Sequence, residues 1–169
     1  MLYSMVKATS TDHFVKLVNN RFKFSLFLLF KLPSAWLSGV RMHKMDVHSA
    51  TTVVPYRWLS QNPFGSTYFA CLAMAAEMST GVLAMAHVTD APARVSMLVT
   101  GLEGIFLKKA KTRTYFTCEQ GDDIRNAIMQ AVESGNSSAI TISITGRSDD
   151  GTEIARFKIT WSFKSTPKT

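Results

Sequence analysis

The chain has 169 residues, of which 46% are hydrophobic and 18% are charged. This balance excludes an intrinsically disordered chain and is typical of one globular domain with a sizeable core. The formal net charge of +7 favours anionic partners such as phosphates, nucleic acid or an acidic membrane surface, but it does not choose among them.

The two cysteines, Cys71 and Cys118, lie far apart in the sequence. Neither belongs to a Cys-x-x-Cys pair, and no histidine stands at the spacing of a metal ligand. We therefore predict no metal site. Two unpaired cysteines suit a reducing compartment, so the expected location is the cytoplasm.

Residues 1–39 are predicted to form a helical extension that packs on the main body. Apolar residues at helical spacing predict one helix from Thr11 to Arg21 and a second from Ser25 to Leu32, which Pro33 breaks or kinks. The apolar run from Phe24 to Phe30 is too short to span a bilayer and does not resemble a secretory signal. Packing against the body is its expected role, and attachment to a membrane surface is the alternative.

Between Val40 and Tyr56 the composition shifts toward β-branched residues, which predicts a hairpin. Pro55 confines the end of this hairpin to a sheet edge or a strand terminus. His43 and His48 lie on the hairpin without a carboxylate at a catalytic spacing. We therefore expect both histidines to face solvent or to have structural partners.

The longest low-charge stretch runs from Asn62 to Ala86. Alanine, leucine and methionine dominate it, and Ser66 or Thr67 can cap its start, so we predict a helix from about Ser66 to about Met85. Apolar residues occupy every side, which is the pattern of a helix buried all round. A membrane span is the competing interpretation. A charged residue in mid-helix and the lack of flanking Lys or Arg clusters argue against an integral membrane segment.

Glu77 is the only acidic or basic side chain in this predicted helix. A carboxylate is almost never fully buried without a partner. If Glu77 is desolvated, its pKa rises toward the range that suits a general base or a nucleophile. The alternative is that Glu77 pairs with an Arg or Lys across a subunit interface and takes no part in chemistry.

Two strands are predicted after the central helix. Alternation of side chains predicts a long strand from Val95 to Leu107, and Gly101 and Gly104 predict a bulge or bend within it. A basic turn then leads to a second strand from Thr112 to Cys118.

The last third of the chain has the clearest patterns. Gly121 opens an amphipathic surface helix that Gly135 stops. Alternating residues then predict strands over 140–145 and 157–164, joined as a hairpin by Asp149-Asp150-Gly151. Each strand has one apolar face, which indicates an antiparallel sheet that covers a core on one side.

The predicted fold class is therefore α+β, with an antiparallel sheet curled around one long apolar helix and extra helices at the N-terminus. The expected divisions are the helical extension, a main domain over residues 40–164 and a C-terminal tail over residues 165–169.

This arrangement, together with Asn62, Gly65 and the Ala76-Glu77 pair, resembles the hotdog fold of acyl-coenzyme A thioesterases. The phenylacetate-pathway type and a related branch of uncharacterised thioesterase-like proteins are the most similar. The resemblance extends from about Phe27 to about Phe163, and the motif that carries it is short.

In such thioesterases an Asn precedes the helix, a His-Gly-Gly turn starts it, and an Asp or Glu stands about two turns in. Asn62 and Glu77 match the first and last of these positions, 15 residues apart. The resemblance implies that Glu77 activates water or attacks the thioester carbonyl, while Asn62 helps to hold that water. Tyr68-Phe69-Ala70 replaces the His-Gly-Gly turn, so the phenol of Tyr68 stands in place of an imidazole. The backbone amide of Phe69 is still expected to donate to the developing oxyanion.

The resemblance also implies a homodimer, possibly paired into a tetramer, in which two sheets join edge to edge and the active site lies at the subunit interface. Coenzyme A would lie along basic residues, and its acyl chain would run beside the central helix. The candidates for phosphate binding are Lys108, Lys109, Lys111 and Arg113. The candidates for substrate contact near the helix are Phe64, Gly65, Phe69, Met74 and Met78. A solvated turn that aids solubility is the alternative interpretation of the basic group.

The leading functional hypothesis is a cytoplasmic acyl-coenzyme A thioesterase, or thioesterase-like protein, that needs no cofactor beyond its thioester substrate. The second hypothesis is a hotdog protein that binds acyl groups or fatty acids without hydrolysis, and the Tyr68-Phe69-Ala70 substitution favours it. A third hypothesis, a basic nucleic-acid or membrane-surface module, depends on charge alone. No stacking-aromatic and glycine motif of RNA-binding proteins accompanies that charge, so we expect no nucleic-acid partner.

Overall fold

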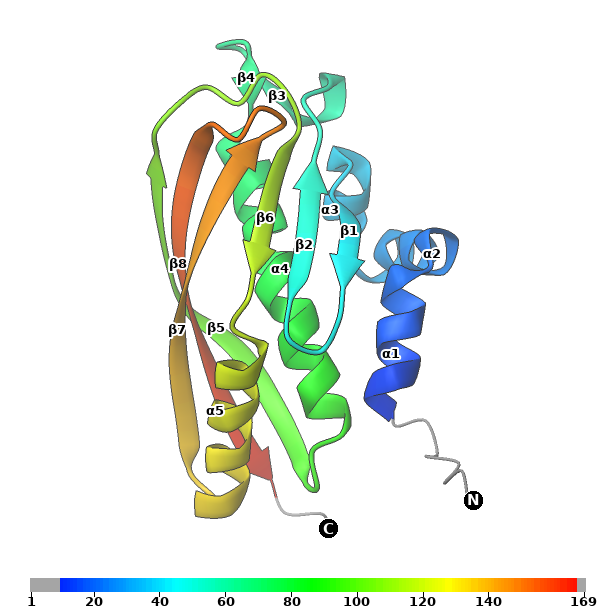
Figure 1. Cartoon of the computed structure of the whole chain (residues 1–169), viewed down its shortest axis with the longest axis vertical. Coiled ribbons are helices and arrows are strands. Elements are labelled where there is room, and N and C mark those ends of the chain that lie inside the picture. Colours follow the sequence, from blue (N-terminus) through cyan, green and yellow to red (C-terminus); the bar gives the residue numbers. More distant parts are fainter. Residues whose placement is uncertain (1–9, 167–169) are drawn as a thin grey trace, which may run out of the picture.

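The computed structural model describes residues 10–166, and its main feature is a six-stranded antiparallel sheet curled around one long helix, α4 (Phe69–Thr89) (Figure 1). Across the sheet the strands follow the order β1 (Arg41–Met45), β2 (Ala50–Val54), β6 (Thr114–Cys118), β7 (Ser137–Ser148), β8 (Glu153–Thr166) and β5 (Arg94–Phe106). The surface helix α5 (Gly121–Ser134) follows β6, as predicted. This is the hotdog arrangement, so the predicted fold class is confirmed.

Helix α4 is buried over most of its surface, which agrees with its all-apolar sequence pattern. Ala75, Ala76, Leu83 and Ala84 are completely buried. The helix is long and apolar enough to cross a membrane, yet 67% of its most apolar window is buried inside the fold. It is therefore a core helix of the kind the sequence predicted.

Three N-terminal helices cover the side of α4 that the sheet leaves open: α1 (Ser10–Asn19), α2 (Arg21–Lys31) and α3 (Pro33–Ser38). The first two were predicted, and α3 was not. The Asn20 side chain caps α2 by accepting from the amide of Lys23, and Pro33 starts α3 rather than merely ending α2.

Long-range hydrogen bonds hold α1 in place. The Asn19 amide group donates to the carbonyl of Met45 at 2.7 Å and accepts from the Met45 amide at 2.9 Å. The buried Thr11 hydroxyl donates to the carbonyl of Ala86 at 2.8 Å. The first helix is thus tied to both strand β1 and helix α4, and the N-terminal helices share one core with the sheet.

The predicted hairpins are confirmed over residues 41–54 and 137–166. The bulge expected in β5 lies between Val99 and Gly101. Gly104 forms no bulge and pairs regularly with Phe157, whose ring lies against it. Strand β8 ends at Thr166, two residues beyond the predicted domain end, while residues 1–9 of the predicted extension and 167–169 of the predicted tail lie outside the described residues.

The predicted start of the central helix is wrong by three residues. Ser66 and Thr67 do not cap the helix but form strand β4 (Ser66–Thr67), which pairs with β3 (Gln61–Asn62) after the short helix η1 (Trp58–Ser60). The amide of Thr67 donates to the carbonyl of Ala110 at 2.8 Å. This contact with a distant loop holds the segment extended, so the helix begins at Phe69.

We predict that Gly146→Ala destabilises the protein by about 1–3 kcal/mol, the usual cost of overpacking a core. A Cβ at Gly146 would lie 2.4 Å from the ring of Phe116, which is completely buried and cannot move aside. The free energy of unfolding from urea denaturation is the measurement. Gly101→Ala is the matched control, because its Cβ would meet only ordinary contacts with Thr160; its effect is expected to stay within about 1 kcal/mol. Equal losses in both variants would contradict the packing argument.

Candidate functional site

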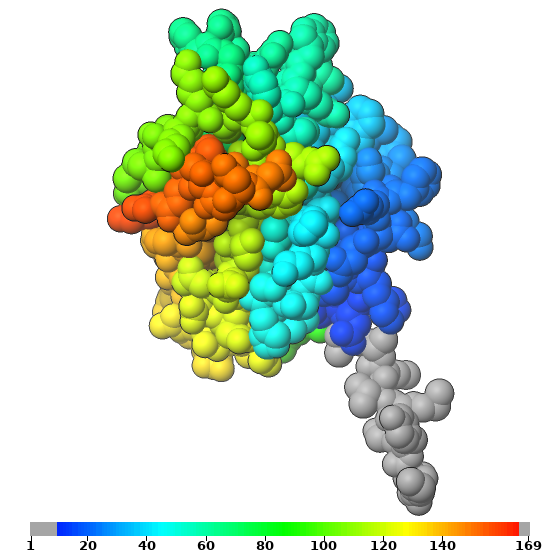
Figure 2. Space-filling view, turned by 45° about the horizontal axis from the view of Figure 1, so that its top comes forward, coloured from blue at the N-terminus to red at the C-terminus, as the bar shows by residue number. Residues whose placement is uncertain are grey.

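A pocket of about 570 Å³ lies at the start of α4 and is called here the helix-start pocket. It forms where the β3–β4 turn meets the loop after β5, and both segments gather at the top of the molecule in Figure 2. Predicted site residues make up much of its wall, together with apolar residues: Asn62, Phe64, Tyr68, Phe69, Leu72, Phe106, Leu107, Lys108 and Lys109.

The Asn62 side chain holds the β3–β4 turn. Its amide nitrogen donates to the Ser66 hydroxyl at 3.1 Å, and its oxygen accepts from the Phe64 amide at 3.0 Å. Gly65 completes this turn with a left-handed φ of 71°. Both polar atoms of the Asn62 side chain are therefore engaged within the turn, and the residue shapes the rim of the pocket.

Free backbone amides lie at the start of α4. Tyr68 is the N-cap residue, and its side chain makes no capping hydrogen bond. The N–H groups of Phe69 and Ala70 meet no acceptor among residues 10–166. Unpaired amides at a helix N-terminus favour a negative charge, so the predicted oxyanion donor, the amide of Phe69, has the required freedom.

The predicted basic group is divided between two places. Lys108 and Lys109 line the helix-start pocket, and the Lys109 ammonium donates to the carbonyl of Phe64 at 2.9 Å. Arg113 instead lines a separate groove with Arg21 and Arg41. Lys111 is exposed on the loop between them.

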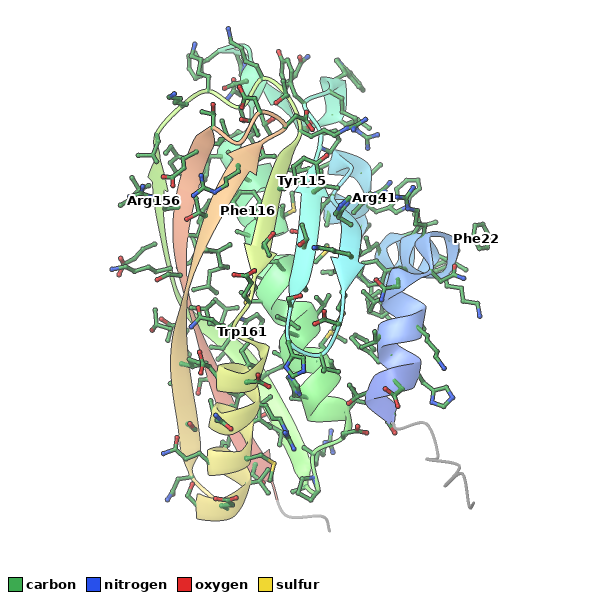
Figure 3. The ribbon with its side chains drawn as sticks, viewed as in Figure 1. Phe22, Arg41, Tyr115, Phe116, Arg156 and Trp161 are labelled. Atoms are coloured by element: carbon green, nitrogen blue, oxygen red, sulfur yellow. The ribbon has the colours of Figure 1, made fainter. Side chains whose placement is uncertain are left out.

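Glu77 occupies a second pocket, of about 80 Å³, between α2, α4 and the strands β5 and β8; we call it the Glu77 pocket. Its other lining residues are apolar: Phe14, Phe24, Phe27, Leu28, Leu32, Met78, Gly81, Val82, Met85, Met97 and Trp161. A Cβ on Gly81 would lie 3.1 Å from Glu77 Oε1 and 3.4 Å from the Trp161 ring. The missing side chain at position 81 therefore leaves space beside the carboxylate, next to the indole that Figure 3 labels.

The Glu77 carboxylate has no compensating partner in the described part of the chain. No group among residues 10–166 donates a hydrogen bond to it or forms an ion pair with it, and desolvation by burial raises the pKa of its carboxyl above the ordinary value. The predicted anomaly is thus present in the structure. A poorly solvated carboxylate of this kind is a stronger base than an exposed one.

One chain does not bring all the predicted residues together. Glu77 lies eight positions after Phe69 on the helix, which is about 12 Å along the axis at 1.5 Å per residue. Met78 lines the Glu77 pocket, whereas Met74 lies one turn before Glu77, partly buried against the core. The amide of Phe69 and the carboxylate of Glu77 in a single chain are therefore too far apart to act on one carbonyl group.

One polar pair was not predicted from the sequence. His48 Nδ1 lies 3.0 Å from Asp122 Oδ2, joining the β1–β2 turn to the start of α5. Both side chains are largely exposed, which is the solvent-facing, structurally paired state expected for His48. A separation of 74 positions in the sequence hid the contact from any local pattern. Among residues 10–166, no group of three or more His, Cys, Asp or Glu side chains is arranged to hold a metal ion.

Comparisons with known proteins agree with this architecture. The family model described as a domain of unknown function (DUF4442) matches residues 20–163. A search among curated proteins finds no match.

Solved structures share the fold at low sequence identity. A Pseudomonas aeruginosa protein described as a probable thioesterase has a TM-score of 0.72 and 19% identity, covering 86% of this chain and 96% of that one. A protein of unknown function from Chlorobaculum tepidum has a TM-score of 0.74 and 14% identity, covering 94% and 98%. A Haemophilus influenzae thioesterase has a TM-score of 0.58 and 11% identity, covering 83% and 88%.

We predict that Glu77→Gln stabilises the protein at neutral and alkaline pH. Because the folded state raises the pKa of Glu77, ionisation above that pKa opposes folding, and the neutral amide removes the penalty. The variant should exceed the wild type by on the order of 1 kcal/mol in free energy of unfolding at about pH 8, and the gap should shrink toward about pH 4.

Urea denaturation at several pH values provides the measurement. Glu133→Gln, on the exposed face of α5, is the control and should show no such pH-dependent gain. A Glu77→Gln gain that is the same at all pH values would contradict a desolvated carboxylate.

Proposed function

We propose that this chain, which belongs to the DUF4442 family, hydrolyses acyl thioesters with Glu77 as the general base or nucleophile. The observation that carries the proposal is an unpaired carboxylate facing an apolar pocket on the central helix of a hotdog fold. Relatives of the same fold are described as thioesterases, which supports this reaction class.

The chemistry follows from the environment of Glu77. As a general base, the carboxylate takes a proton from water while the water oxygen attacks the thioester carbonyl. As a nucleophile, the carboxylate attacks the carbonyl itself and forms an anhydride, which water then hydrolyses. In both routes the carbonyl oxygen becomes negative, the carbon–sulfur bond breaks, and the thiol leaves with a proton. The apolar walls from Phe27 and Met78 would hold the acyl group beside the carboxylate.

The oxyanion donor is expected to come from a second copy of the chain. Within residues 10–166, strand β5 pairs only with β8 and is therefore an edge strand; its exposed apolar side chains include Leu98, Leu102 and Ile105. Pairing of two β5 edges about a two-fold axis would cover these side chains and run the two α4 helices antiparallel. The helix-start pocket of one copy could then face the Glu77 pocket of the other, whose wall includes Met97 of β5.

The acyl carrier is proposed to be coenzyme A. Lys108 and Lys109 lie at the helix-start pocket beside the free amides of α4, where both the ammonium groups and the helix dipole attract phosphates. Arg113 lies in a different groove. We therefore propose that it contacts only the part of coenzyme A that lies farther from the thioester, and contributes less to binding than the two lysines. The protein is proposed to act in the cytoplasm and to need no cofactor.

Binding of an acyl ligand without hydrolysis is the second candidate function. The Phe69 ring occupies the position where the related thioesterases have glycine. It packs against Tyr68 at 4.8 Å and Phe106 at 6.1 Å between ring centroids. These rings narrow the path by which a thioester carbonyl would reach the amides at the helix start. Such narrowing would slow hydrolysis more than it would weaken binding of an acyl ligand.

We expect Glu77→Gln to lower kcat for acyl-coenzyme A hydrolysis by about 10²–10⁴-fold, the usual contribution of a general base. The assay uses short, medium, long and aromatic acyl thioesters, with free thiol as the readout. Asp122→Asn removes a carboxylate that lines neither pocket and should leave kcat unchanged. Absence of turnover in the wild type, together with tight acyl binding, would establish the second candidate instead.

We expect Leu98→Arg combined with Ile105→Arg to convert the proposed dimer into monomers. The new arginines of one copy would lie close to those of the other across the paired β5 edges, and their like charges would repel. Sedimentation velocity measures the mass. Hydrolysis should fall together with dimerisation, since the oxyanion donor would then be missing. A monomeric wild type with full activity would refute the shared site.

A further inference from the structure

Helix α2 has two apolar faces rather than one. The inner face, with Phe24 and Leu28, is buried in the core and helps to line the Glu77 pocket. The outer face carries Phe22, Leu26, Leu29 and Phe30 at the spacing i, i+4, i+7, i+8, which places them on one side of the helix. All four are exposed, Phe22 at 80% and Phe30 at 73%. Figure 3 shows the Phe22 ring pointing away from the body of the protein.

The chain segment that contains α2 carries charge of a single sign. From Phe14 to Met45 the chain contains no Asp or Glu. The same segment contains six basic residues: Lys16, Arg21, Lys23, Lys31, Arg41 and Lys44. Arg21 and Lys31 stand at the two ends of α2, and Lys23 lies in its first turn.

A groove beside the first turn of α2 adds to this positive surface. It measures about 470 Å³, and its wall includes Arg21, Arg41 and Arg113. None of the Asp or Glu residues that the structure describes lines it. The Arg41 guanidinium stacks on the Trp36 ring at 5.7 Å and keeps its place beside the helix.

We propose that the outer face of α2, made of Phe22, Leu26, Leu29 and Phe30, with Lys23 beside it and Arg21 and Lys31 at the two ends of the helix, docks on the surface of a bilayer containing anionic phospholipids. Aromatic and aliphatic side chains enter the headgroup region, and the basic side chains pair with lipid phosphates. The helix has only 11 residues and lies on the bilayer without crossing it.

The positive charge of α2 favours an anionic bilayer over a second copy of the chain as the partner of this face. A two-fold contact through the same face would place Arg21, Lys23 and Lys31 opposite the same cations, with no carboxylate between residues 14 and 45 to compensate them. Anionic lipid supplies the missing negative charge and also covers the apolar side chains.

The location of α2 gives the docking a consequence for the pocket. The same helix that meets the bilayer lines the Glu77 pocket from its other side. A bilayer docked on the outer face would therefore lie one helix away from the pocket. Docking itself needs no hydrolysis, so it stands or fails independently of the proposed thioesterase activity.

Vesicle co-sedimentation tests the proposal with the full-length protein. The vesicles are phosphatidylcholine alone, or phosphatidylcholine with roughly 30% phosphatidylglycerol. Binding is expected to be at least tenfold tighter to the anionic vesicles. Both Phe22→Ser/Phe30→Ser and Lys23→Glu/Lys31→Glu should lose that binding by about tenfold or more, and added salt should weaken the wild type.

Matched controls distinguish binding through this face from nonspecific hydrophobic or electrostatic binding elsewhere on the protein. Phe64→Ser removes an equally exposed aromatic ring from the β3–β4 turn, and Lys158→Glu/Lys164→Glu reverses two exposed charges on β8. Both should retain binding, as should Glu77→Gln. Circular dichroism checks that each variant is folded.

Two results would overturn the proposal. One is wild-type protein that binds neither kind of vesicle, or whose α2 variants bind as well as the controls. The other is a pair of observations: wild-type protein does not bind vesicles, and Phe22→Ser/Phe30→Ser has a lower particle mass than the wild type in lipid-free sedimentation. That pair would assign the face to contact between copies of the chain.

Discussion

The structure depends on the burial of most of a long helix that has no polar face. Helix α4 is stable in water only because the sheet encloses one side and α1–α3 cover the other. Its few polar side chains are satisfied locally. Ser79 donates to the carbonyl of Ala76 at 2.7 Å, and Thr80 donates to the carbonyl of Glu77 at 2.8 Å while accepting from the Trp161 indole at 2.8 Å. The carboxylate of Glu77 is the exception on this helix, since none of the described residues pairs with it. Because the other polar side chains of α4 have hydrogen-bond partners, we interpret the unpaired carboxylate as a functional feature rather than a packing defect.

The departure from a glycine turn also has a structural reason. The Phe69 ring begins a series of edge-to-face contacts that passes through Phe106 and Phe157 to Phe116, with ring centroids 5.6 to 6.1 Å apart. Phe116 and Phe157 belong to the buried core. The residue at the helix start is therefore anchored by its side chain, while its backbone amide remains free. The wall of the helix-start pocket is coupled to the core in a way that a glycine could not provide.

Much of this fold could be predicted from the sequence because its strongest patterns are local. The alternating isoleucines of β7, the amphipathic repeat of α5 and the all-apolar character of α4 each fit one environment. The failures share the opposite property. The helix start was misplaced because Thr67 bonds to Ala110, 43 residues away. Sequence spacing also could not reveal that both polar atoms of the Asn62 side chain bond within a local turn, and its role in holding water stays a prediction. Spacing along the chain identified the unusual carboxylate but not the groups that would face it.

The N-terminal helices belong to the site rather than to its surroundings. The sequence presents them as an extension before the hotdog domain, yet the family match begins at residue 20 and includes α2 and α3. Helix α2 contributes Phe24, Phe27 and Leu28 to the wall around Glu77. Without that wall, one side of the carboxylate would face water, and the desolvation that raises its pKa would be lost. The basicity of Glu77 is thus a joint product of α4, which carries the carboxylate, and α2, which keeps water from it. A movement of α2 would change the solvation of Glu77, which connects the outer face of this helix to the chemistry proposed at its inner face.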